Sequence, residues 1–478
     1  MVIESFSPKP VQVTGLRALQ YALRFVLDPI ATMRECDRVF GQFAVLTGAL
    51  PFTANVRLVP FGVPLVLTAG APFNREVLSN PTTWRGIGLL LGGPRNSATS
   101  RLSEGALMRM RGLRHEHYRS LIIAPLRKPM IEQLGNAMLR IAQQSVATLP
   151  QGESIDLVNY AIRLSRTLAL ELLFASNMES AESISRLAER VLETSWRLSV
   201  AGFPVSLPLT PFSRYLREAE LLENRMLAWA KRKRGSKDER DLGAIVVNST
   251  DENGNPTGDA IAAAQLSVML LMSFEACASA LMWALILIAQ HPTVARNLHD
   301  ELIETVASSA DFERIARLPL LDSVVKEVLR IIPPVPLHFR VAQEDAVLAN
   351  FAFPRGTLVV LSGYLTNRQP DIYQDPSCFR PERWKTISPS PFQLMGFSAG
   401  PFACPGYWFA LSVIKAALAA ILRCYRVALI PPVRIDYKLQ PTLRPAGRVL
   451  VMLCRHDGTF TAEPISGTVT KIVRFAEA

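Results

Sequence analysis

Apolar residues recur every three or four positions through most of the segment from about residue 100 to 330. This spacing is typical of α-helices that bury one face, so the pattern predicts that the middle of the chain is mainly helical. Two groups with this spacing are Met138, Ile141 and Ala142, and Leu187, Val191 and Leu192.

The longest apolar stretch runs from Ala262 to Gln290 and carries Glu275 near its middle. A carboxylate at that depth would cost a membrane-spanning helix about 2.5 to 3.5 kcal/mol. We therefore expect a buried core helix there, and no transmembrane anchor in the chain.

Short runs rich in Val and Leu, mostly flanked by Gly or Pro, lie toward both ends of the chain and predict β-strands. They are Val56 to Val59, Leu65 to Thr68, Thr357 to Leu361, and Val449 to Leu453. A strand system drawn from both ends indicates one interleaved fold. We expect a mainly α fold with a smaller β portion, in a single domain over residues 1–478.

Composition narrows the class of protein. Hydrophobic residues make up 49% of the 478 residues and charged residues 19%, which excludes an intrinsically disordered chain. The six cysteines include no Cys-x-x-Cys pair, which argues against a zinc or thioredoxin-like site. Residues 1–10 carry no apolar secretory signal, so the expected location is the reducing cytoplasm.

The net charge of +11 suggests acidic partners. The basic run from Lys231 to Arg240 contains no aromatic residue, and such runs are usually solvated connections. We therefore expect a surface loop there and no nucleic-acid partner.

A candidate metal ligand is Cys404, in the segment from Phe397 to Gly406, just ahead of a strongly helical pattern. Backbone N–H groups and the positive end of a helix dipole favour thiolate over thiol, so this setting predicts a lowered pKa. The alternative from this stretch alone is a small buried apolar residue.

This segment resembles the cysteine-ligand loop of the cytochrome P450 family, Phe-x-x-Gly-x-Arg-x-Cys-x-Gly. Phe397, Gly400, Cys404 and Gly406 match the pattern, whereas Phe402 stands where the family usually has a basic residue. The departure implies that one contact to a haem propionate is missing.

Companion motifs follow in the family's order. Glu327 and Arg330 match its Glu-x-x-Arg motif and lie on one helical face, and Arg383 in the later segment Phe379 to Trp384 is implied to join them. His115, Arg119 and Arg340 stand where the family binds the haem propionates. The resemblance therefore implies haem b, with Phe397 and Gly400 in the cofactor loop and Cys404 as the iron ligand.

In the family, an acid and an alcohol at the middle of the long helix deliver protons to bound dioxygen. Here Glu275 supplies the acid, but Ala276 replaces the threonine and Cys277 is a weak donor. Glu275 is accordingly the candidate catalytic residue, with a pKa expected to rise by burial. The alternative is a purely structural carboxylate.

The resemblance implies a monooxygenase that hydroxylates a lipophilic small molecule, such as a terpenoid, sterol-like compound or polyketide. Only 74 residues follow Cys404 (478 minus 404), so we expect no fused reductase and, instead, a separate ferredoxin-type carrier with its reductase. Two alternatives stay open: an isomerase, dehydratase or peroxide-using enzyme, which would tolerate Ala276, and a non-catalytic haem or ligand binder. The substrate pocket is expected near residues 87–110 and 203–209, the helix around Phe274, and residues 335–338. His338 is a candidate polar contact there.

Overall fold

The computed structural model describes residues 10–47, 52–53, 58–59, 63–90, 92–150, 152–175, 178–202, 204–238, 241–305 and 311–475. The α-helices are α1 (Gly15–Leu27), α2 (Pro29–Phe40), α3 (Ala71–Leu78), α4 (Ala98–Glu104), α5 (Gly112–Ile123), α6 (Lys128–Ala147), α7 (Leu157–Leu173), α8 (Met178–Ser195), α9 (Leu198–Ala201), α10 (Pro211–Lys233), α11 (Leu242–Val247), α12 (Asp259–Ala289), α13 (Pro292–Thr305), α14 (Phe312–Ala316), α15 (Pro319–Ile331), α16 (Gly363–Thr366) and α17 (Tyr407–Leu422).

The strands are β1 (Val11–Val13), β2 (Phe43–Leu46), β3 (Phe52–Thr53), β4 (Leu58–Val59), β5 (Leu65–Thr68), β6 (Trp84–Gly86), β7 (Ser154–Asp156), β8 (Leu337–Ala342), β9 (Ala346–Leu348), β10 (Phe351–Phe353), β11 (Leu358–Ser362), β12 (Tyr425–Leu429), β13 (Val433–Arg434), β14 (Tyr437–Leu439), β15 (Leu443–Pro445), β16 (Leu450–Arg455) and β17 (Ile465–Ser466).

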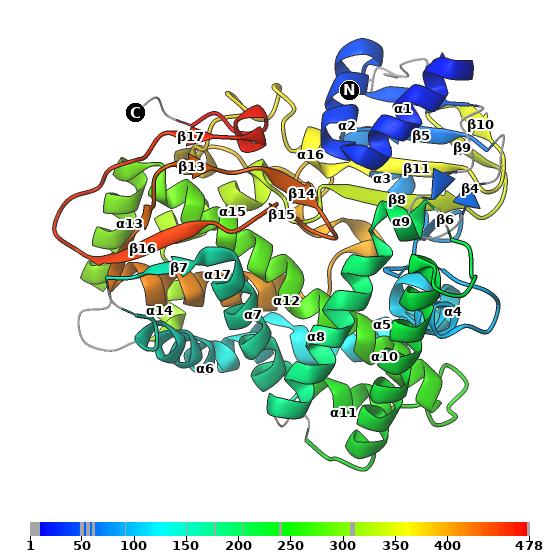
Figure 1. Cartoon of the computed structure of the whole chain (residues 1–478), viewed down its shortest axis with the longest axis horizontal. Coiled ribbons are helices and arrows are strands. Elements are labelled where there is room, and N and C mark those ends of the chain that lie inside the picture. The colour runs from blue at the N-terminus through cyan, green and yellow to red at the C-terminus, as the bar shows by residue number, and fades with distance from the viewer. Residues whose placement is uncertain are drawn as a thin grey trace, which may run out of the picture.

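The largest sheet among the described residues joins strands from distant parts of the chain, in the order β1-β2-β5-β11-β8-β6. β5 pairs in parallel with β11, with Leu65 opposite Leu358. Figure 1 shows this sheet, with α1 and α2 beside it, at one side of a larger helical body. The interleaved fold and three of the predicted strands are confirmed, at β5, β11 and β16. Of the fourth run, Val56 and residue 57 lie outside the described residues, and β4 covers Leu58–Val59.

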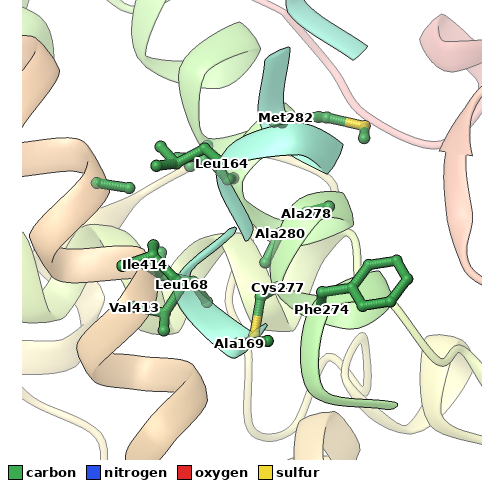
Figure 2. Close-up of a cluster of buried hydrophobic side chains, with 14 of the residues drawn as sticks. Leu164, Leu168, Ala169, Phe274, Cys277, Ala278, Ala280, Met282, Val413 and Ile414 are labelled. Carbon is green, nitrogen blue, oxygen red and sulfur yellow. The ribbon is translucent and has the colours of Figure 1, made fainter. Parts of the chain in front are cut away.

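The predicted helical segment is confirmed, since the helices from α4 to α15 occupy most of it. Met138 and Ala142 are fully buried on α6, as are Val191 and Leu192 on α8. These helices pack around α12, which contacts α7, α10, α4 and α17. In Figure 2, Leu164 and Leu168 of α7 and Ile414 of α17 gather beside the middle of α12.

Helix α12 is the predicted core helix. It is long and apolar enough to cross a bilayer, but 83% of its most apolar window is buried inside the protein. Ser279 Oγ and Trp283 Nε1 both donate to the carbonyl oxygen of Leu443, each at 2.7 Å, and so fix the second half of α12 to β15. A helix with such neighbours on its sides belongs to the protein core.

The basic run at Lys231 to Arg240 differs from its prediction. Lys231, Arg232 and Lys233 form the last turn of α10 instead of a loop. Lys233 is buried, where its ammonium pairs with Asp241 and donates to the carbonyl oxygen of Phe174 at 2.6 Å. The apolar periodicity of α10 continues into the basic run, so one of its charges points inward and needs a buried partner.

Candidate active site

The predicted metal ligand lies in a short irregular segment between two 3₁₀ turns and α17. The backbone N–H of Cys404 donates to the carbonyl oxygen of Phe397 at 2.8 Å, which folds the segment back on itself. Gly400 has a φ of +60°, and a Cβ there would lie 2.9 Å from the carbonyl oxygen of Leu78. Glycine is therefore required at 400, and the turn presents Cys404 with its side chain accessible.

The pKa of Cys404 departs from its prediction. A backbone hydrogen bond from Gly406 and the charge of Arg119 lower the pKa, but burial raises it by more, so the net shift is upward. The thiol is thus accessible to a ligand and yet deep in the protein. A cation bound at the sulfur would provide the charge that the loop alone does not supply.

The middle of α12 presents one accessible face within an otherwise buried helix. Val268, Met269, Met272, Ser273 and Ala276 are partly accessible and share this face by their helical spacing. Burial raises the pKa of the Cys277 thiol first and the charge of Cys404 raises it second, which places the two cysteines near one another. The accessible thiol and this mainly apolar face of α12 therefore belong to one region.

Cys277 itself does not face that region. It is buried, its Sγ lies 3.4 Å from the carbonyl oxygen of Ser273, and Figure 2 shows it pointing toward Ala169 of α7. The alcohol missing at Ala276 is therefore not replaced by the neighbouring thiol.

Arg340 and Phe402 form a contact that the sequence did not predict. The guanidinium of Arg340 lies 4.3 Å from the centre of the Phe402 ring, and the ring of His115 lies 6.3 Å from the same ring. Arg340 is buried on β8, and burial lowers its pKa to about 10. Its Nε has no hydrogen-bond partner among the described residues, so a buried cation is available to an anionic ligand.

His115 and Arg119 lie on α5 as predicted, four residues apart and half-buried. Burial and the charge of Arg119 lower the pKa of His115. Arg119 donates to the carbonyl oxygen of Ala403 at 2.6 Å and therefore ties α5 to the cysteine loop. The structure thus brings His115, Arg119, Arg340 and Phe402 together around the loop of Cys404.

Glu275 is 2% exposed and lies among charged residues from other elements. Its pKa is raised to about 8 by burial first and by the nearby Glu189 second, while Arg444 and Arg166 oppose the shift. Its Oε1 has no hydrogen-bond partner among the described residues. The direction of the shift agrees with the prediction, and burial favours the protonated form of this carboxyl.

The predicted ion-pair network around Glu327 is confirmed. Arg330 Nη2 donates to Glu327 Oε1 at 2.8 Å, and Arg383 Nε donates to the same oxygen at 3.0 Å. Trp384 Nε1 completes the cluster by donating to Oε2 at 3.0 Å. This network holds α15 to the segment that leads into the cysteine loop.

The helix around Phe274 was expected to line the pocket, and it carries the accessible face described above. Phe274 itself is fully buried, with the guanidinium of Arg166 at 5.1 Å from its ring centre, so it does not belong to that face. His338 Nε2 lies 3.2 Å from the carbonyl oxygen of Met395, and burial lowers its pKa to about 4. Its Nε2 is therefore already engaged with the backbone, although the side chain is partly accessible. Phe203, in the predicted 203–209 segment, lies outside the described residues.

A family model described as Cytochrome P450 matches residues 95–452, a range that holds both motif clusters and Cys404. The chain belongs to the cytochrome P450 family. It is therefore a P450-type oxidoreductase, and the cofactor of this family is a haem iron.

This P450 is 28% identical over 366 residues to cytochrome P450 3A13 of Mus musculus, covering 70% of this chain and 71% of that protein. It is 34% identical over 208 residues to the mitochondrial 25-hydroxyvitamin D-1 alpha hydroxylase of Homo sapiens, and this match covers 42% of this chain and 41% of the relative. The solved structure of retinoic acid bound cyanobacterial CYP120A1 superposes with a TM-score of 0.78 at 24% identity, covering 94% of this chain and 100% of that one. The mainly α fold of the P450 type is thereby confirmed.

The residues of this P450 fit a haem. Cys404 offers an accessible thiol, and the accessible face of α12 is mainly apolar, as a porphyrin face requires. Arg340 is a buried cation whose Nε has no partner among the described residues, which suits a propionate. At the position where the family usually has a basic residue, Phe402 provides an aromatic ring that contacts the guanidinium of Arg340.

Sequence reasoning missed the residues that surround Glu275. They are Arg166 of α7, Glu189 and Glu193 of α8, and Arg444 of β15. Glu189 and Glu193 are four residues apart on a helix, which by itself indicates only a polar face. Nothing in the sequence pairs them with a residue on α12, because that contact is created by the fold.

Proposed function

We propose that this P450 binds haem b through Cys404 and hydroxylates a lipophilic small molecule, using dioxygen and electrons from a separate ferredoxin-type carrier in the cytoplasm. The observation that carries the proposal is that the loop matching the family motif holds an accessible cysteine and contacts a buried arginine, Arg340, whose Nε has no hydrogen-bond partner among the described residues. One residue supplies the iron ligand and the other the propionate site.

When bound, a thiolate-ligated haem supplies the electron density that favours cleavage of the O–O bond. The chain's own residues do the rest. Gly406 donates a backbone hydrogen bond to the sulfur, which moderates its basicity. His115, Arg119 and Arg340 would hold the propionates, and Arg119 also fixes the carbonyl group before Cys404.

The proposed substrate class follows from the accessible face of α12. Val268, Met269, Met272 and Ala276 present methyl and thioether groups there, with Ser273 as the polar member. The Ser273 hydroxyl already donates to the carbonyl oxygen of Leu270 at 2.7 Å. Such a surface favours an apolar molecule, in keeping with the vitamin D derivative in the name of the human relative.

We assign to Glu275 the role of proton donor in the proposed reaction. It holds a proton near neutral pH and borders the accessible face, because Met272 and Ala276 are its neighbours on the helix. The positive net charge of the chain suits an acidic electron carrier.

A second function is favoured by one observation. Ala276 offers no hydroxyl and Cys277 is turned into the core, so the usual alcohol of the proton relay is absent. A peroxide-using enzyme, or a haem isomerase or dehydratase, does not need that relay. Turnover with peroxide but none with dioxygen and reductant would favour this second function over hydroxylation. Ligand binding without turnover under any oxidant would instead indicate a non-catalytic haem protein.

The decisive test is the spectrum of the reduced protein with carbon monoxide. The wild type should show the thiolate-ligated Soret band, and Cys404→Ala should lose it. Cys424→Ala is the matched control, since Cys424 is also exposed and follows the other end of α17. A thiolate band retained in Cys404→Ala would exclude Cys404 as the ligand, and a wild type that binds no haem would exclude the function. Product formation is then measured with compounds that shift the Soret band.

A further inference from the structure

The accessible face of α12 ends at a buried polar side chain. Gln265 lies one turn before Met269 on the same side of the helix, yet it is fully buried, whereas Val268 and Met269 are partly accessible. We propose that Gln265 is a positioning residue that closes this end of the substrate pocket and so limits the length of the molecule that fits along α12. The inference rests on the proposed function, because it concerns the pocket of that reaction.

Gln265 is covered by residues 105–110, which follow α4 and cross α12; we call them the crossing segment. Its Oε1 accepts from the backbone N–H of Leu107 at 3.1 Å, and its Nε2 donates to Met110 Sδ at 3.4 Å. Leu107 is the first residue of a 3₁₀ turn over Leu107–Arg109, so its N–H needs an acceptor from outside that turn. One side chain thus satisfies this donor and attaches both ends of the turn to α12.

The crossing segment is packed closely on two sides. A Cβ added at Gly105 would lie 2.6 Å from the Cβ of Ala264, the residue before Gln265. A Cβ added at Gly86 of β6 would lie 3.0 Å from the carbonyl oxygen of Met108. Carbon atoms in contact normally lie about 3.5 to 4.0 Å apart, so only glycine permits these approaches. The crossing segment is therefore held between α12 and the large sheet.

An ion pair fixes the helix that leads into the crossing segment. Arg101 of α4 donates from Nε to Oε1 of Glu223 at 2.7 Å, and from Nη2 to the other carboxylate oxygen. The side chain of Glu223, on α10, is 6% exposed. This pair attaches α4 to α10, and Gln265 attaches the next turn to α12. The crossing segment is thus anchored on two helices and forms a fixed wall.

The position of this wall defines the class of ligand. At a rise of about 1.5 Å per residue, the accessible face extends about 12 Å from Ala276 to Val268, which lie eight residues apart (276 minus 268). The Gln265 amide is buried under the crossing segment, so it offers no polar contact to a substrate. An elongated apolar molecule of about that length fits along α12, and a longer one meets the crossing segment.

The first test measures the pocket with N-alkylimidazoles, in which the imidazole binds the haem iron and the alkyl chain extends along α12. Binding is followed by the shift of the Soret band. In the wild type, affinity should rise about 4-fold for each methylene that is buried, up to octyl, and gain nothing from octyl to dodecyl. Gln265→Met removes the acceptor for Leu107 and keeps a side chain of similar length. In this variant dodecylimidazole should bind about 10-fold or more tightly than octylimidazole.

Ser267→Ala is the matched control. Ser267 is also buried on α12, but its Oγ donates within the helix, to the carbonyl oxygen of Ala263 at 2.8 Å. This variant should keep the wild-type dependence on chain length. Gly105→Ala acts at a separate contact, because its Cβ would push the crossing segment away from Ala264. It should extend the pocket as Gln265→Met does, and it decides the test if Gln265→Met loads too little haem.

Hydrogen exchange gives a second readout that needs no bound ligand. The amide of Leu107 should be protected in the wild type, because it donates to Gln265. Its exchange should become about 10-fold or more faster in Gln265→Met, since a local opening then breaks no hydrogen bond to α12. Ser267→Ala should exchange there at the wild-type rate. A general loss of stability would instead speed exchange throughout the helical body.

The outcomes separate this inference from the proposed function. A wild type that gains affinity steadily through dodecyl would show an open pocket end and would overturn the inference. The same chain-length limit in the wild type, Gln265→Met and Gly105→Ala, or unchanged exchange at Leu107, would also overturn it. A chain-length limit that Gln265→Met removes, in a protein that forms no dioxygen-dependent product, would support the inference and overturn hydroxylation.

Discussion

Phe402 replaces a basic residue in the cysteine loop, but it keeps a role in the proposed haem site. A basic side chain at this position would add a second positive charge beside Arg340. The ring instead lies 4.3 Å from the Arg340 guanidinium and 6.3 Å from the ring of His115. The aromatic face attracts the guanidinium of Arg340 and fixes its orientation. Phe402 therefore does not contact a haem propionate itself, but positions Arg340 to do so.

Replacing Phe402 by Leu should therefore weaken haem binding. A cation–π contact contributes about 0.5 to 2 kcal/mol, which corresponds to a roughly 2- to 30-fold faster transfer of haem to a competing apoprotein. The control is Phe392→Leu, since the guanidinium of Arg75 lies 4.6 Å from that ring in a contact outside the site. Equal transfer rates for the two variants would contradict the role assigned to Phe402.

At the scale of elements, Glu327 joins α15 to the segment before the cysteine loop. It is fully buried and accepts from Arg330, Arg383 and Trp384, and from the backbone N–H of residue 380 at 3.0 Å. Breaking a buried ion pair by removing one partner typically costs about 3 to 5 kcal/mol. Glu327→Gln should thus lower the thermal unfolding midpoint and the yield of haem-loaded protein. Glu382→Gln, which alters an exposed pair with Arg380, should change neither by a comparable amount.

Elements could be predicted from the sequence where local pattern decides them. The helical middle, strands β5, β11 and β16, the core helix α12 and the Glu327 network all follow from periodicity or from short motifs. The prediction of a surface loop from Lys231 to Arg240 was wrong because α10 continues through Lys233, and its packing turns that side chain inward. The contact of α8 with Glu275 and the stacking of Arg340 on Phe402 join residues far apart in the chain, and only the folded arrangement reveals them.

For the whole molecule, two groups with shifted pKa values, His338 and Glu275, change stability with pH in opposite senses. His338 has a folded pKa of about 4, below its ordinary value of 6.5, so the unfolded chain alone takes up a proton between these values. Stability therefore falls as the pH drops from 6.5 to 4, by about 3 kcal/mol at most. Glu275 has a folded pKa of about 8, above its ordinary 4.5, so the folded chain alone keeps the proton between these values. Stability from this group falls as the pH rises from 4.5 to 8.

These opposite slopes can be separated by two substitutions. In a plot of unfolding temperature against pH, His338→Gln should reduce the fall in unfolding temperature between pH 6.5 and 4. Glu275→Gln should reduce the fall in unfolding temperature as the pH rises toward 8. Each variant should leave the other side of the profile unchanged, because the two groups lie on β8 and α12 and share no interacting group among the described residues. Glu313→Gln serves as the control, since its exposed carboxylate pairs with Arg317 at the surface. A profile whose alkaline side keeps its slope in Glu275→Gln would show that this carboxyl is already ionised at neutral pH, and that Glu275 holds no proton to deliver.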